Sequence, residues 1–227
     1  MMKLGKRETF SSIMALALPI VAEEILSTLL QYVDTAMVGR LGAEATASVN
    51  LTSTVNWLLG SLMSSFGIAI VAMISSSYGR KDREGIKRQS ATGFLLSLAL
   101  GLTLFAICLS ISPFLPTWMN ADPAIRKRAG EYFFIISLAL PFRSLSVMAA
   151  SSMRAIKDSK TPMVVNLSQN LVNIILNYIL IYPMEMGVKG AAAATFVSYT
   201  LGSVVMAQAA YRKKELSIAR SELENQK

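Results

Sequence analysis

The stretch LPIVAEEILSTLLQYVDTAMVGRL, from Leu18 to Leu41, decides the fold because it is long and apolar enough to cross a bilayer. It nevertheless carries Glu23, Glu24 and Asp34 between its ends. An ionisable side chain in hydrocarbon is costly and usually faces a cavity or a partner inside the protein. Glu23 and Asp34 lie eleven residues apart, about three helical turns, so a helix places them on one face. The remaining segments must supply what this polar seam faces.

The rest of the chain has the composition of a membrane protein. Of its 227 residues, 53% are hydrophobic and 16% are charged, against roughly 25% charged in an ordinary soluble domain. The mean hydropathy is +0.47. We predict an all-α polytopic membrane protein with six transmembrane helices. The predicted helices cover approximately Phe10–Val38, Ala47–Ser77, Ser90–Ile111, Arg126–Met153, Met163–Tyr182 and Ala191–Tyr211.

The distribution of basic residues predicts how the chain is oriented. Lys and Arg concentrate near the N-terminus, at 80–88 and at 154–160, and the positive-inside rule assigns such segments to the cytoplasm. The cluster at 126–128 falls on the opposite side and runs against the rule. We expect a multi-pass protein of the bacterial inner membrane with both termini in the cytoplasm and no cleavable signal peptide. The net charge of +8 does not indicate nucleic-acid binding, because the basic residues lie between apolar runs.

Composition also limits the chemistry. The chain has no histidine, the commonest metal ligand, and its single cysteine, Cys108, cannot form an intramolecular disulfide. It contains no Gly-rich phosphate loop, no cysteine pair and no Ser–His arrangement. We therefore expect no enzyme activity, no catalytic residue, no metal site and no cofactor other than a coupling proton or sodium ion.

Asp34 is the leading candidate for a coupling site. On the functional interpretation its carboxylate alternates between protonated and charged forms as a cavity opens to either side of the membrane. The structural alternative is a charge that reaches the interface, because Arg40 follows only about 9 Å further along the axis. The usual role of intramembrane acids favours the functional interpretation. Gln31 lies one turn before Asp34 and close to the same stripe.

A second polar stripe lies between residues 163 and 182. Spacings of four, three and four residues place its four asparagines on one helix face. They are Asn166, Asn170, Asn173 and Asn177. Interhelical hydrogen bonding and cavity lining explain this stripe equally well.

Arg143 is the one deep basic residue. It lies eleven residues before Arg154, about 16 Å along a helix, which is too deep for full snorkelling to the interface. We expect a structural ion pair with Glu23 or Glu24 inside the bundle. The alternative is a counter-ion whose release is coupled to the arrival of substrate or proton.

Three blocks of sequence carry a family resemblance, and they are LPIVAEEILSTLLQYVDTAMVGRLG, RAIKDSKTP and GVKGAAAAT. They resemble, in order and spacing, segments of the multidrug and toxin extrusion (MATE) family of cation-coupled antiporters. The resemblance implies a twelve-helix transporter with two lobes around a substrate cavity, a common transporter plan. Residues 1–211 would form the N-terminal six-helix lobe, and residues 212–227 would be the cytoplasmic tail that corresponds to the interlobe linker.

The resemblance also implies roles for particular residues. Asp34 takes the place of the family's ion-coupling aspartate, with Gln31 beside it and Glu23 as a second titratable group. The fifth-helix polar pair of one branch of the family falls on Asn173 and Asn177, and its sixth-helix threonine falls on Thr195, so the resemblance implies that these residues line the cavity. Position 177 departs from one branch of the family, which has an aspartate there.

We therefore expect a proton- or sodium-coupled antiporter that exports organic cations or other drug-like amphipathic molecules, present as a half-length chain. A half cavity would be open to lipid, so the expected partner is a second six-helix lobe, either the missing C-terminal half or another copy. One alternative is a truncated lobe or partner subunit that transports nothing. Another is a lipid-linked glycan flippase of the same architecture, whose cavity would be strongly cationic.

Overall fold

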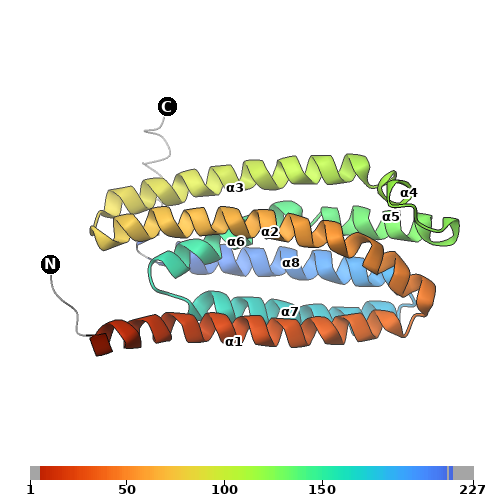
Figure 1. Cartoon of the computed structure of the whole chain (residues 1–227), viewed down its shortest axis with the longest axis horizontal. Coiled ribbons are helices and arrows are strands. Elements are labelled where there is room, and N and C mark those ends of the chain that lie inside the picture. The colour runs from red at the N-terminus through yellow and green to blue at the C-terminus, as the bar shows by residue number, and fades with distance from the viewer. Residues whose placement is uncertain (1–5, 214, 217–227) are drawn as a thin grey trace.

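The computed structural model describes residues 6–213 and 215–216. Every regular element within these residues is a helix, which confirms the all-α class, and the long helices lie side by side in one bundle (Figure 1). The helices are α1 (Lys6–Gly39), α2 (Ala43–Gly79), α3 (Arg83–Ile111), α4 (Leu115–Trp118), α5 (Pro123–Ser137), α6 (Leu140–Ala155), α7 (Lys160–Ile181) and α8 (Gly187–Tyr211).

Five of these helices, α1, α2, α3, α7 and α8, are long and apolar enough to cross a membrane by length and composition. The helices α5 and α6 together make a sixth candidate span, bent by 44° at its break. The prediction of one continuous helix over Arg126–Met153 is therefore wrong. The break falls at 138–139, just before Pro141, which lacks an amide hydrogen and so cannot donate the helical hydrogen bond to the carbonyl of Ser137.

Short connections make successive long helices antiparallel neighbours. Asp82 caps α3 by accepting a hydrogen bond from the backbone N–H of Gly85 at 2.8 Å. Asp122 caps α5 in the same way through the N–H of Ala124 at 2.9 Å. An acidic N-cap satisfies an otherwise unpaired donor and favours a helix start at that residue. The first of these caps lies in the turn between α2 and α3, and the second lies in the turn between α4 and α5.

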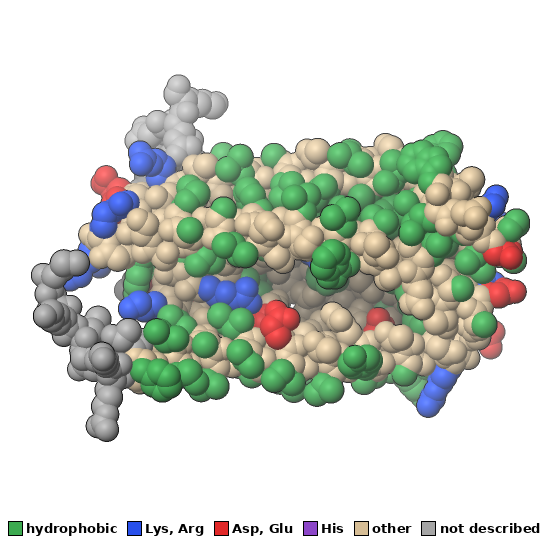
Figure 2. Space-filling model, viewed as in Figure 1, with side chains coloured by type: hydrophobic (Ala, Val, Ile, Leu, Met, Phe, Trp, Pro, Cys, Tyr) green, Lys and Arg blue, Asp and Glu red, His purple; other side chains and the backbone are tan. Residues whose placement is uncertain are grey.

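The outer surface of the bundle is apolar along most of its length. Large side chains such as Ile68 and Leu29 are 70% and 56% exposed, as lipid-facing residues are. Figure 2 shows hydrophobic side chains scattered along the visible face and most of the charged ones gathered at its two ends. Large apolar residues such as Phe133, Met63 and Ile74 are buried between the helices.

The segment after α8 packs back onto the bundle. Lys213 forms an ion pair of 2.6 Å with Asp158 in the turn between α6 and α7, and Leu216 is buried in an apolar cluster with Met153 and Ile156. The rest of the predicted tail of residues 212–227, namely 214 and 217–227, lies outside the described residues. The basic residue Lys3, used to predict the orientation, also lies outside them.

Candidate functional site

The polar faces of α1 and α7 meet along a regular seam. Three side-chain hydrogen bonds join residues that are all 143 positions apart in the chain. The pairs are Glu23 with Asn166, Ser27 with Asn170, and Asp34 with Asn177. Because both partners advance together, α1 and α7 run parallel and in constant register over three turns. The two stripes identified in the sequence therefore face each other.

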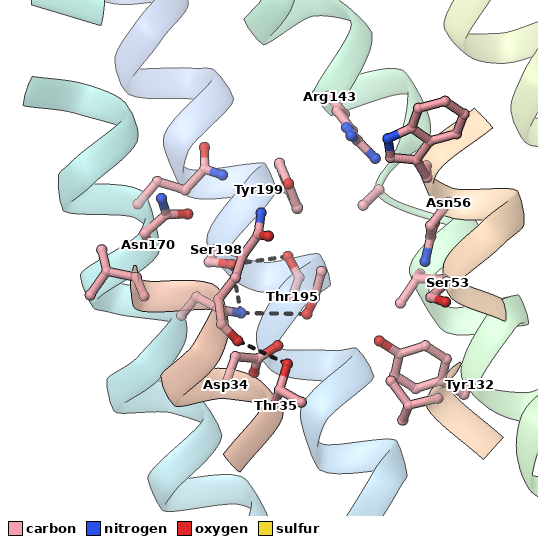
Figure 3. A pocket seen from close by; sticks show the side chains of 18 of the residues that line it. Asp34, Thr35, Ser53, Asn56, Tyr132, Arg143, Asn170, Thr195, Ser198 and Tyr199 are labelled. Atoms are coloured by element: carbon pink, nitrogen blue, oxygen red, sulfur yellow. Dashed lines mark hydrogen bonds between the residues drawn. The ribbon is translucent and has the colours of Figure 1, made fainter. Parts of the chain in front are cut away.

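Asp34 is the first member of a hydrogen-bonded chain across three helices. The fully buried Asn177 donates from Nδ2 to Asp34 Oδ1 and to Asn173 Oδ1, the latter at 3.2 Å. Asn173 then donates to Thr195 Oγ1 at 3.4 Å and to Ser198 Oγ at 3.3 Å on α8 (Figure 3). The structure thus brings together Asp34, the expected coupling residue, and Asn173, Asn177 and Thr195, the three residues that the resemblance assigns to the fifth and sixth helices.

Beside this chain lies a cavity of about 700 Å³ that is open on one side. Figure 2 shows the hollow in the face of the molecule between α1 and α2. Its lining comes from α1, α2, α5, α6, α7 and α8, so every candidate span except α3 contributes. Its polar and charged lining residues include Gln31, Asp34, Ser53, Thr54, Asn56, Arg143, Gln169, Asn170, Asn173, Thr195 and Ser198.

The four asparagines of α7 divide between the two roles left open by their spacing. Asn170 and Asn173 line the cavity, and both also make hydrogen bonds. Asn166 and Asn177 are absent from the lining and serve as links to acidic residues of α1. The asparagine stripe therefore serves both as an interhelical contact and as part of the cavity wall. Its face is wide enough to contact α1 along one edge and to border the cavity along the other.

The expected ion pair between Arg143 and Glu23 or Glu24 is wrong. Glu23 is only 5% exposed and accepts two hydrogen bonds from the Arg154 guanidinium, at 2.9 and 3.0 Å. Arg154 lies in the last turn of α6, next to the start of α7 and its Asn166. Arg143 lies eleven residues before Arg154, about 16 Å away toward the start of α6. Glu24 is exposed, since one residue turns the side chain about 100° around the helix.

The sequence reasoning missed several lining residues. Tyr132 on α5 and Tyr199 on α8 face the cavity, and Trp57 lies at its rim with 74% of its surface exposed. Aromatic residues in apolar helices have no periodic signal that separates cavity lining from lipid contact. The polar first half of α2 was a usable signal, because Thr54 and Asn56 from that segment do line the cavity.

Comparison with known proteins identifies the family. The MatE family model matches residues 19–179, which is most of the chain. The chain belongs to the MatE family. The probable multidrug resistance protein NorM of Thermotoga maritima is 27% identical over 216 residues, covering 93% of this chain and 46% of that protein. The multidrug resistance protein NorM of Photobacterium profundum is 28% identical over 204 residues, 86% of this chain and 43% of its own length.

Solved structures agree with the sequence relatives. The outward-facing structure of a multidrug resistance MATE family transporter of the MOP superfamily superposes with a TM-score of 0.88 at 26% identity, over 93% of this chain and 47% of that chain. The chain thus spans about half the length of the MATE relatives that it matches. The resemblance inferred from the sequence is confirmed, and so is the fold of one MATE lobe. A multi-pass membrane protein follows from this family and from the apolar helices.

Proposed function

We propose that this MATE lobe is part of a cation-coupled antiporter that exports organic cations or other drug-like amphipathic molecules. The observation that carries the proposal is Asp34, placed in a membrane-spanning helix at the wall of a polar cavity large enough for a drug-sized molecule. The multidrug resistance names of the two NorM relatives support the same substrate class.

The mechanism we propose is alternating access driven by the charge of Asp34. The carboxylate accepts the Asn177 amide hydrogen when charged. A proton or sodium ion arriving there removes the negative charge and weakens this contact, because hydrogen bonds to ionised groups are the stronger ones. The relay through Asn173 transmits the change to the neighbouring helix α8. One charge crossing 100 mV supplies about 2.3 kcal/mol, enough to bias export roughly fiftyfold.

A second six-helix lobe completes this proposal. Polar groups that face hydrocarbon without partners are costly, and the cavity of the described lobe opens on one side. Both termini would lie in the cytoplasm of a bacterial inner membrane, since Lys and Arg gather at the end of the bundle that holds the α2–α3 turn (Figure 2). The contrary cluster at 126–128 is partly neutralised, because Arg128 pairs with Glu44 at 3.3 Å.

The flippase alternative has one observation in its favour, the placement of Arg143 in the cavity lining. A strongly cationic cavity would need more than this single base, and the lining contains no lysine among the described residues. The other alternative is a lobe that transports nothing. Measuring efflux after expression with and without a second lobe distinguishes it from the proposed antiporter.

The test is ethidium efflux from membrane vesicles, with the proton and sodium gradients collapsed separately. It is run for this chain alone and together with a second lobe. Asp34→Asn should abolish efflux while leaving membrane insertion intact. Asp82→Asn, an exposed change at a helix cap, is the matched control and should leave efflux unchanged. Efflux that survives Asp34→Asn would remove Asp34 from the coupling role.

A further inference from the structure

Arg143 is a positioned cation that the proposed coupling mechanism does not use. It projects from α6 into the cavity, and its guanidinium carbon lies 5.6 Å from the centre of the Tyr199 ring on α8 (Figure 3). On another side it packs against Gly60 of α2, where an added Cβ would lie 2.5 Å from an Arg143 terminal nitrogen. The charge is therefore held between two helices by a ring face and a glycine, without a carboxylate.

Among the residues whose side chains the structure describes, no anion compensates this charge. Arg143 makes neither an ion pair nor a hydrogen bond with those residues. The one acid in the cavity lining, Asp34, lies apart from Arg143 in Figure 3 and is bonded to Asn177. Arg143 is half-buried in the cavity wall and stays charged under all ordinary conditions, and a partly desolvated charge without a carboxylate partner is costly. An anionic ligand group would recover that cost.

We propose that Arg143 binds a carboxylate of the transported molecule, so that the cavity prefers amphoteric compounds over simple organic cations. The guanidinium fork matches the two oxygens of a carboxylate. A single base suits one negative charge rather than a phosphate dianion. When Asp34 is charged, the cavity offers an anion on one wall and a cation on another, with the rings of Tyr132 and Tyr199 between its polar groups for an aromatic body.

This inference names the substrate class of the proposed exporter and rests on that function for the transport step, but binding tests it separately. The probes are rhodamine 110, which carries a free carboxylate, and its methyl ester rhodamine 123. Their binding to the protein in nanodiscs is followed by fluorescence anisotropy. Arg143→Gln should weaken rhodamine 110 binding about tenfold or more, the worth of a hydrogen-bonded charge pair, and leave rhodamine 123 binding unchanged.

Two further variants keep the test decisive if Arg143→Gln fails to fold. Arg143→Lys keeps the charge but loses the fork, so rhodamine 110 should bind with intermediate strength. Gly60→Ala keeps the arginine and displaces its guanidinium, and it should selectively weaken rhodamine 110. Arg88→Gln removes an exposed charge and is the matched control, with no effect on either dye.

Equal losses for both dyes, no loss for either, or wild-type protein that does not prefer rhodamine 110 would overturn the inference. Selective binding combined with absent efflux of both dyes would instead overturn the proposed antiporter and support the carboxylate site. Selective binding and selective efflux together support both.

Discussion

Removing either partner of the ion pair between Glu23 and Arg154 should destabilise the protein, but by unequal amounts. The side chain of Glu23 is 7% exposed, whereas the side chain of Arg154 is 27% exposed. Arg154→Gln leaves a carboxylate deep in the bundle with only Asn166 as a donor. Glu23→Gln leaves a guanidinium that can reach water in part. Removal of the arginine should therefore cost more than removal of the acid.

The expected magnitudes follow from burial. Leaving a buried charge without its partner costs about 3–5 kcal/mol, which we assign to Arg154→Gln. For Glu23→Gln we expect about 1–3 kcal/mol, because the remaining charge is partly solvated and the amide isostere still fills the site. The double variant should be more stable than Arg154→Gln alone, since it buries no unpaired charge.

The measurement is the free energy of unfolding of each variant in mixed detergent micelles, combined as a double-mutant cycle. Residues in direct contact should couple by about 0.5–3 kcal/mol. The control cycle pairs Glu23→Gln with Arg143→Gln, two residues that make no ion pair in this structure, and these changes should be additive. An additive result for Glu23 with Arg154, or equal losses for the two single variants, would refute the reasoning.

Two further predictions concern packing and pH. In Gly101→Ala the new Cβ would lie 2.8 Å from the Pro141 backbone, which should destabilise the α3–α6 contact by about 1–3 kcal/mol, whereas Gly79→Ala meets open space and should slightly stabilise the chain; thermal unfolding of both variants measures this. Burial raises the pKa of Asp158, but hydrogen bonds from Lys213 and Thr161 outweigh it and hold that pKa below its ordinary value. The stabilisation from Asp158 should therefore be complete above the unfolded pKa of about 4 and be lost as pH falls through the lower folded value. Accordingly, Asp158→Asn should lower the melting temperature at pH 7, and its difference from the unchanged protein should shrink below about pH 4; a difference that is constant with pH would contradict this.

Much of the candidate site was predictable because helical periodicity is a local property. The shared face of Glu23 and Asp34 follows from eleven residues of spacing, and the asparagine stripe of α7 follows in the same way. Apolar length was enough to locate five spans and the region of the sixth. The resemblance assigned roles to Asp34, Asn173, Asn177 and Thr195, but it did not predict which of them would be hydrogen-bonded to one another.

The sequence by itself determined the approximate helix positions and the polar stripes, since each depends on residues within a few turns of one another, whereas the lobe architecture was what the family resemblance implied. Tertiary structure alone decided that Glu23 pairs with Arg154 and that Arg143 lies against Tyr199 in the cavity. These outcomes depend on how helices distant in sequence approach each other. The physical reason is that a charge in a bundle pairs with whichever group the packing of the helices places within hydrogen-bonding distance. The spacing of residues along the chain does not determine that distance.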